Sequence, residues 1–149
     1  MRRAMLVGLI GANIQKSLSP ALFEDSCVAH GIVGHYHLMD LDRLPGRCLT
    51  DLLAGARALG FVGLNVTFPC KEAVLPLLDD VSAEAREIGA VNTVVIGVDG
   101  RTTAYNTDRT GFRRSVEETL GRDSITGQTA VLVGAGGAGR AAALSLIHI

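Results

Sequence analysis

The hydrophobic positions of this chain form short apolar runs that alternate with stretches of helical periodicity. Three runs, residues 4–10, 35–41 and 61–67, have the length of strands, and the first is apolar throughout, as expected of a strand buried on both faces. Apolar residues recur at helical spacing in residues 45–60, which predicts a helix that stops at Gly60. Because strands alternate with helices, we expect an α/β fold with a mainly parallel sheet.

Capping and turn residues divide the remainder of the chain. Ser19 followed by Pro20 predicts the start of a helix with Ser19 as its N-cap. Residues 81–89 predict a second capped helix, and residues 92–106 predict two strands joined by a turn. A further helix is expected over residues 108–121.

Composition and charge narrow the classes of function. The 149 residues have a formal net charge of −1 and show no run of like charges, so nucleic acid and anionic membrane surfaces are poor partners. No apolar run reaches the roughly 18 residues of a membrane span. Three cysteines at irregular spacing predict reduced thiols in a cytoplasmic protein. His35 and His37 share a face of one predicted strand without an evident third ligand, so we predict no metal site.

The apolar run at residues 129–133 predicts another strand, and a glycine-rich turn follows it. The pattern G-x-G-x-x-G is formed by Gly134, Ala135, Gly136, Gly137, Ala138 and Gly139, and an Ala-rich helix should follow it. This context is typical of a dinucleotide site, where the glycines permit a tight turn, the approach of a pyrophosphate and close packing of helix and strand. The residue that separates NAD from NADP is expected about 20 residues further on, past residue 149. An ordinary glycine turn is the alternative.

Polar side chains gather at the ends of the predicted strands, where open α/β sheets bind ligands. They are Ser17, Ser19, Asn65, Thr67, Lys71, Asn92, Asn106, Thr107 and Asp108. Each has a structural alternative: Asp108 could cap a helix, Asn92 could fix a turn, and Lys71 could be solvated. Lys71 is one of two lysines beside twelve arginines, and lysine can release its proton where arginine cannot.

Five segments resemble the shikimate dehydrogenase family in order and spacing. They are SLSP, GLNVTFPCK, GAVNTVV, YNTDRTGF and VGAGGAG. The resemblance runs from about Leu6 to Ala143 and covers roughly the first half of a family member. It implies an N-terminal substrate domain, a dinucleotide domain, and a C-terminal return of the chain to the first domain.

The resemblance also implies an activity, the NADP(H)-dependent interconversion of 3-dehydroshikimate and shikimate on the route to chorismate and aromatic amino acids. By position, Ser17 and Ser19 would hold the substrate carboxylate, while Thr67, Asn92 and Asp108 would hold ring hydroxyls. Lys71 and Asp108 would form the catalytic pair. An ammonium suits this role, because it can stabilise the oxygen that gains charge and then donate a proton.

The sequence also admits other hypotheses for the function. The loop GANIQKSLSP lacks a proline often found in shikimate-specific members, and some relatives oxidise quinate with NAD. Those relatives often carry threonine in place of the second serine, so Ser19 favours shikimate. A non-catalytic ligand-binding relative is a further alternative. The resemblance implies a small-molecule substrate and admits a homodimer.

We expect three segments along the chain. Residues 1–125 should form the substrate-binding domain, residues 126–143 the truncated start of a dinucleotide-binding Rossmann domain, and residues 144–149 a non-native tail. The tail, LSLIHI, places an isolated histidine where a helix should continue, and it matches a translation of the end sequence of a common sequencing-library transposon. Such a fragment should be inactive alone, and its strand at Thr129 should lack sheet partners.

Overall fold

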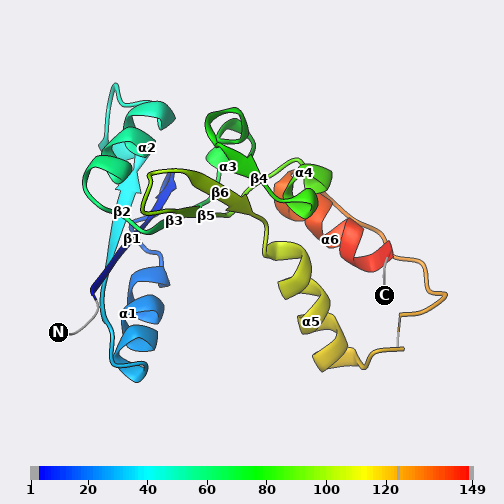
Figure 1. The fold of residues 1–149 in the computed structure, drawn as a ribbon. Helices are drawn as coiled ribbons and strands as arrows, with labels where there is room; N and C mark the ends of the chain where they lie inside the picture. Colours follow the sequence, from blue (N-terminus) through cyan, green and yellow to red (C-terminus); the bar gives the residue numbers. More distant parts are fainter. Residues whose placement is uncertain (1–3, 124, 148–149) are drawn as a thin grey trace.

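The computed structural model describes residues 4–123 and 125–147, which contain one six-stranded sheet in the order β2-β1-β3-β5-β6-β4 (Figure 1). The strands are β1 (Ala4–Gly11), β2 (Val33–Asp40), β3 (Gly63–Val66), β4 (Asp80–Val81), β5 (Thr93–Ile96) and β6 (Thr102–Tyr105). The α-helices are α1 (Ser19–Ala29), α2 (Leu49–Ala58), α3 (Cys70–Ala73), α4 (Ala83–Ile88), α5 (Asp108–Leu120) and α6 (Gly137–Ile147). Two 3₁₀ turns span Leu41–Arg43 and Leu75–Leu77.

The sheet is mixed but mostly parallel, which confirms the expected α/β class. β1 lies between β2 and β3 and is parallel to both, and β4 is parallel to β6. β5 is the exception, because it runs antiparallel to β3 and to β6. The turn between β5 and β6 is closed by the bond from the Gly97 amide to the Arg101 carbonyl at 2.8 Å, so the predicted hairpin is the source of the exception.

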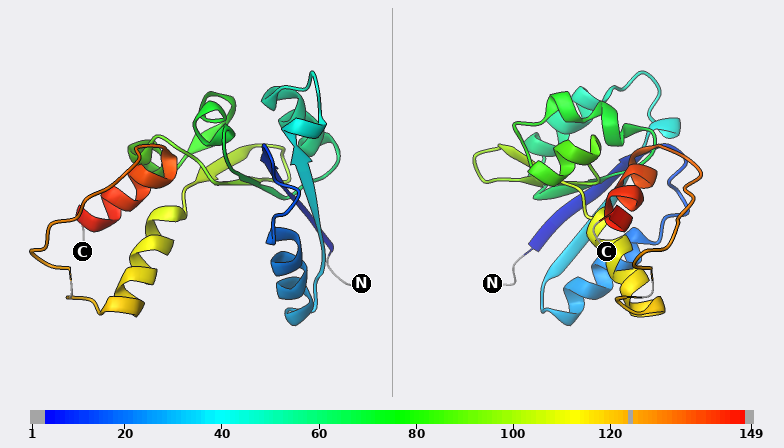
Figure 2. Two further views of the ribbon diagram at one scale, coloured as in Figure 1. Left: turned by 180° about the vertical axis from the view of Figure 1, so that it is seen from behind. Right: turned by 90° about the vertical axis from the view of Figure 1, so that its right-hand side faces the viewer.

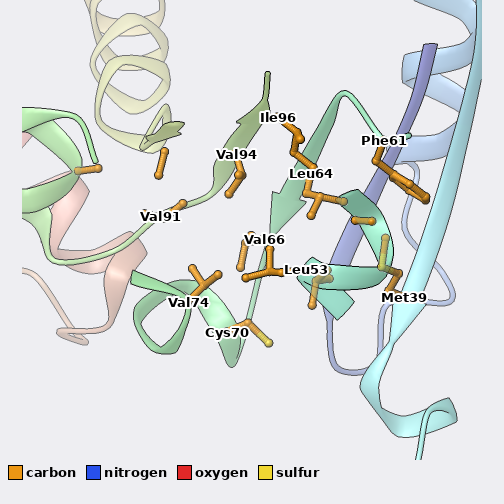
Figure 3. Close-up of a cluster of buried hydrophobic side chains, with 14 residues drawn as sticks. Met39, Leu53, Phe61, Leu64, Val66, Cys70, Val74, Val91, Val94 and Ile96 are labelled. Atoms are coloured by element: carbon orange, nitrogen blue, oxygen red, sulfur yellow. The ribbon is translucent and has the colours of Figure 1, made fainter. Parts of the chain in front are cut away.

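The hydrophobic core lies on one face of the sheet, beneath α2, α3 and α4. Figure 3 shows side chains of β3 and β5 meeting those of α2 and of the segment that contains α3. The buried cluster consists of Ile10, Met39, Leu53, Ala56, Phe61, Leu64, Val66, Cys70, Val74, Ala85, Val91, Val94, Ile96 and Ala104. Full burial of one such Leu or Val side chain stabilises the fold by about 1.5–3 kcal/mol. This packing fixes α3 against the ends of β1 and β3.

Helix ends follow the local sequence signals at α4 and depart from them at α1. Ser82 Oγ accepts the Ala85 amide at 3.2 Å, and Gly89 ends α4 with φ 70°. The N-cap prediction for Ser19 is wrong, because Ser19 is already helical and its hydroxyl accepts a hydrogen bond from Ser17 Oγ at 3.0 Å. The two serines are therefore joined to each other at the start of α1.

The predicted strand over residues 129–133 does not form, whereas the expectation that this segment lacks sheet partners is confirmed for the part of the chain that the structure describes. Within the described residues the segment pairs with no strand, and Val131 and Val133 are 87% and 95% exposed. A strand needs a partner to satisfy its backbone groups and cover its apolar side chains. The glycine turn and the helix after it do form as predicted.

Helix α6 lies beside α5 and against α4, away from α1 (Figures 1 and 2). Ala141 is buried with Ile88 and Ala90, and Ser145 Oγ donates to the Arg109 carbonyl at 2.7 Å. The helix continues through Ile147, so part of the expected tail is helical, while His148 and Ile149 lie outside the described residues. None of the helices in the described ranges has the length and apolar character needed to span a bilayer.

Candidate active site

Lys71 and Asp108 form a close ion pair although 37 residues separate them in the sequence. The distance from Lys71 Nζ to Asp108 Oδ2 is 2.6 Å, and the two side chains are 20% and 31% exposed. α3 presents Lys71 because the neighbouring Cys70 is buried in the core and the Lys71 carbonyl accepts the Val91 amide at 2.8 Å. Lys71 is therefore not a freely solvated charge.

Asn92 links Asp108 to the end of the preceding loop. Its Nδ2 donates to Asp108 Oδ1 at 2.8 Å and to Thr107 Oγ1 at 2.9 Å, and its Oδ1 accepts the Thr107 amide at 3.1 Å. The Asp108 carboxylate thus accepts hydrogen bonds from Lys71 and Asn92. The alternative prediction was that this carboxylate would cap α5. Each oxygen of the carboxylate has its own donor, which fixes its orientation.

Asn106 holds the turn that leads into this site. Its side chain is buried, with Nδ2 donating to the Ala90 carbonyl at 2.9 Å and Oδ1 accepting the Asp108 amide at 2.9 Å. The sequence drew attention to Asn106 without giving it a role. Its position two residues before Asp108 is the signal that could have found it, because Asn side chains accept the amide two residues on.

All six residues predicted to contact substrate line one cavity of about 470 Å³. They are Ser17, Ser19, Thr67, Lys71, Asn92 and Asp108. Lys16 and Asn13 also line this cavity, and sequence reasoning did not select them. The cavity therefore combines hydroxyl groups and three side-chain amides, from Asn13, Asn65 and Asn92, with two ammonium groups and one carboxylate.

Tyr36 is a further residue that sequence reasoning missed. Its hydroxyl donates to Asn65 Oδ1 at 2.8 Å, and Asn65 Nδ2 donates to the Asn92 carbonyl at 3.3 Å. Burial raises the pKa of the Tyr36 hydroxyl, and its hydrogen bond with Ser19 opposes part of that rise. Tyr36 thus connects the serine pair at α1 with the cavity wall on β3.

A second cavity, of about 460 Å³, lies between Lys71 and the glycine turn. Its walls come from residues 67–69, 71 and 72 on one side and from residues 133, 134 and 136–139 on the other, so the N-terminus of α6 faces the same space as Lys71. Ala135, the remaining residue of the predicted cofactor-binding turn, does not line it. At Gly136 an added Cβ would meet nothing within 4 Å, which leaves room for a phosphate at the amides of the helix start. The turn therefore fits the phosphates of a dinucleotide.

The other glycines of the motif are needed for close packing and for the turn. Gly134 has φ 107°, and a Cβ on Gly139 would lie 2.3 Å from the Gly134 carbonyl oxygen. A Cβ on Gly137 would lie 2.7 Å from Cβ of Ala90, in the unit that carries Lys71. Gly137 thus allows α6 to approach the ion pair, a packing role that its place in the motif did not suggest.

Arg140 fastens α6 to the same unit. Its Nε donates to the Ile88 carbonyl at 2.7 Å and its Nη2 to the Gly89 carbonyl at 3.2 Å, while Nη2 also pairs with Glu72 Oε1 at 2.8 Å. The guanidinium therefore joins the end of α4, α3 and α6.

Cys70, next to Lys71, is 2% exposed, and burial raises the pKa of its thiol, which disfavours a nucleophilic role. Across the described ranges, no three His, Cys, Asp or Glu side chains gather as they would around a metal ion.

Comparisons with known proteins agree on one family. Residues 9–94 match the family described as "Shikimate dehydrogenase substrate binding domain". The chain is 53% identical to the quinate/shikimate dehydrogenase (NAD(+)) of Corynebacterium efficiens, over 97% of this chain and 51% of that protein. It is 46% identical to the shikimate dehydrogenase (NADP(+)) of Streptomyces avermitilis, over 97% of this chain and 49% of that protein.

The solved structure of quinate dehydrogenase from Corynebacterium glutamicum in complex with NAD has the same fold. It aligns with a TM-score of 0.87 at 45% identity, over 99% of this chain and 52% of that one. The chain spans about half the length of the curated relatives it matches. From its fold, its motifs and the matched substrate-binding region, the chain belongs to the shikimate dehydrogenase family.

Proposed function

We propose that this chain is the substrate-binding half of a nicotinamide-dependent dehydrogenase that interconverts 3-dehydroshikimate and shikimate. The observation that carries the proposal is the 2.6 Å contact between Lys71 Nζ and Asp108 Oδ2. That pair opens into the cavity that Ser17, Ser19 and Thr67 also line. A titratable cation beside neutral hydroxyl groups suits a substrate with one carboxylate, several hydroxyls and one reacting carbonyl.

The serine pair and the polar residues around Lys71 would bind different parts of the substrate. Ser17 and Ser19 would donate hydrogen bonds to the carboxylate, near the start of α1, where the helix dipole favours a negative charge. Thr67 and Asn92 would hold ring hydroxyls on the other side of the reacting carbon. Such fixed contacts place the carbonyl near Lys71 and reduce the entropy cost of reaction.

Lys71 would carry the proton that accompanies hydride transfer. As the carbonyl carbon accepts hydride, its oxygen gains negative charge, which the ammonium stabilises before donating a proton. In the reverse direction the neutral amine accepts the proton of the alcohol. Asp108 would orient the amine throughout, and the bond from Asn92 would keep Asp108 in place.

We assign the glycine turn, Gly134 to Gly139, to the cofactor. A bound nicotinamide dinucleotide would supply or accept the hydride. The open backbone at Gly136 and the first turn of α6 would hold its phosphates. We propose NADP, because the resemblance favours the biosynthetic enzyme. The residue that would select NADP over NAD is expected past residue 149.

A second candidate is an NAD-dependent quinate/shikimate dehydrogenase. The 53% identity to the Corynebacterium efficiens protein of that name favours it, whereas Ser19 favours shikimate. The two candidates differ in a simple assay of a full-length protein that carries this chain as its first half. Faster oxidation of shikimate with NADP supports the first candidate, and faster oxidation of quinate with NAD supports the second.

Replacement of Lys71 tests the proposed chemistry in the same full-length protein. Lys71→Ala should lower kcat/KM by at least about 100-fold, the usual loss when a general acid–base is removed. Lys71→Arg should also be slow, because it restores the charge next to Asp108 without a releasable proton. Nicotinamide absorbance gives the rates, and circular dichroism shows that the variants are folded. Turnover of Lys71→Ala within about threefold of wild type, roughly 0.65 kcal/mol, would exclude Lys71 as the proton donor.

A further inference from the structure

A buried carboxylate stands at the end of β2, outside the cavity. Asp40 is 2% exposed, and it accepts four hydrogen bonds, all from N–H groups. Burial by itself raises the pKa of this carboxyl, but the hydrogen bonds it accepts, the largest from Gln15, lower it below its ordinary value of 3.8. A buried carboxylate is tolerated only when such donors satisfy it.

Three of the four donors come from the loop that leads to the serine pair. Oδ1 accepts the Asn13 amide at 3.1 Å, and Oδ2 accepts the Ile14 amide at 3.3 Å and Gln15 Nε2 at 2.9 Å. The fourth donor is the amide of Asp42 at 3.2 Å. Asp40 therefore ties the end of β2 to a loop about 25 residues away in sequence.

The backbone conformation of this loop is supported by its hydrogen bonds to Asp40. Asn13 is the one non-glycine residue with positive φ in the described part of the chain, at 54°. Its amide donates to Asp40 and also to Asp42 Oδ2 at 3.0 Å. A non-glycine residue at positive φ costs free energy, less for Asn than for most residues, and hydrogen bonds such as these help to hold it there. The Ser17 amide then donates to the Ile14 carbonyl at 2.9 Å, so the held loop ends at the first serine.

We propose that Asp40 is a positioning residue that fixes the loop of residues 12–17 so that Ser17 and Ser19 face the substrate carboxylate. This inference rests on the proposed function. Asp40 is not among the residues that line the cavity, so it acts through the loop. The substrate carboxylate takes no part in the reaction, so the loop would bind it equally well in the ground state and in the transition state. Loss of the Asp40 contacts should therefore raise KM rather than lower kcat.

The variant Asp40→Asn tests the proposal in the full-length protein. It keeps the shape of the side chain but turns an NH₂ group towards two N–H donors. We expect KM for shikimate to rise at least tenfold with kcat within threefold of wild type. The controls Gln15→Ala and Asp42→Ala each remove one side-chain partner of the network, and their KM should stay within threefold. An unchanged KM in Asp40→Asn overturns the proposal.

A double variant separates positioning from general damage. With Ser17→Ala in place, Asp40→Asn should raise KM by clearly less than the tenfold expected in wild type, because one of the two serines through which it acts is already gone. Full additivity of the two changes overturns the proposal. The matched pair Asn13→Val and Asn13→Gly serves if Asp40→Asn does not fold. Both changes remove a side chain that lines the cavity, so the difference between them is the test: valine resists positive φ and should raise KM more than glycine, which adopts it. Equal effects of the pair also overturn the proposal.

Hydrogen exchange on residues 1–149 tests the tie without any assay of activity. Asp40→Asn should speed exchange of the Asn13 and Ile14 amides at least tenfold, while the Leu9 amide in β1 keeps its rate. Unchanged exchange at the loop overturns the inference. A wild-type protein that turns over neither shikimate nor quinate instead overturns the proposed function, and the exchange result still decides the role of Asp40.

Discussion

Residues 4–11 and residues 129–133 are both apolar runs that predict a strand, but their structures are very different. Residues 4–11 form β1, which pairs with β2 on one side and β3 on the other. Residues 129–133 belong to no strand within the described part of the chain, although their apolar pattern predicts one just as well. Ile10 in the first run is fully buried, whereas Val133 in the second is 95% exposed. An apolar run therefore becomes a strand only where partners cover it.

The comparison also separates two kinds of sequence information. Backbone signals act locally, so the glycine turn and α6 form even though the run before them does not pair. The substrate-binding unit, with its packed core, brings Lys71 and Asp108 together without help from residues 129–133. The site geometry is thus a property of the first region, and the second region contributes the start of a helix beside it.

Paired truncations in the two runs give the largest expected difference. Ile10→Ala should lower the free energy of unfolding by about 3 kcal/mol, since it leaves a cavity between β1 and the core. Val133→Ala should change it by less than about 0.5 kcal/mol, as for other exposed positions. Urea unfolding of residues 1–149, followed by circular dichroism, measures both. A loss of more than about 2 kcal/mol in Val133→Ala would show that the second run is packed in solution.

Local chemistry allowed much of this structure to be predicted. Gly89 ends α4 with positive φ, and the turn at Gly97–Arg101 joins β5 to β6. Lys71 and Asp108 were among the polar residues that follow predicted strands, the family resemblance paired them, and the fold places them in contact. Patterns of this kind depend on the residue itself and on near neighbours, which the sequence displays directly.

The features that were missed depend on contacts across the sheet. Tyr36 reaches Asn65 from two strands away, and Asp40 holds the loop that follows the C-terminal end of the neighbouring strand β1. The register of strands decides such contacts, and a single sequence does not display that register. The cap prediction at Ser19 failed for a local reason instead, because Ser17, two residues earlier, accepts the Ser19 amide at 3.2 Å and donates to the Ser19 hydroxyl at 3.0 Å.

Two glycines of one motif offer an intermediate test of how the regions join. Gly137→Ala should destabilise the chain by about 2 kcal/mol, because its Cβ would overlap Ala90 across the junction. Gly136→Ala should leave stability within about 0.5 kcal/mol, since its Cβ meets open space. In the full-length protein the order should reverse for the cofactor, with KM for NADP raised more by Gly136→Ala. If Gly136→Ala is the more destabilising variant, the packing role given to Gly137 is wrong.

The smallest expected effect depends on pH and lies wholly within the packed region. Asp79 Oδ2 accepts the Thr102 amide at 2.8 Å and pairs with Arg57 at 3.0 Å, and these hydrogen bonds, those from Thr102 foremost, lower the pKa of Asp79 below 3.8. A lowered pKa in the folded state means stabilisation that is complete above pH 3.8 and is lost as pH falls below it.

The urea midpoint of Asp79→Asn should therefore lie below that of wild type at pH 7, and the gap should narrow below pH 3.8. Asp80→Asn is the matched control, because its partner Arg101 is exposed and such pairs contribute little. A gap that stays constant from pH 7 to below pH 3.8 would mean that the Asp79 charge does not support the sheet. The stability of the packed region would then not depend on the charge of Asp79, and its apolar contacts, which residues 129–133 lack, would account for more of it.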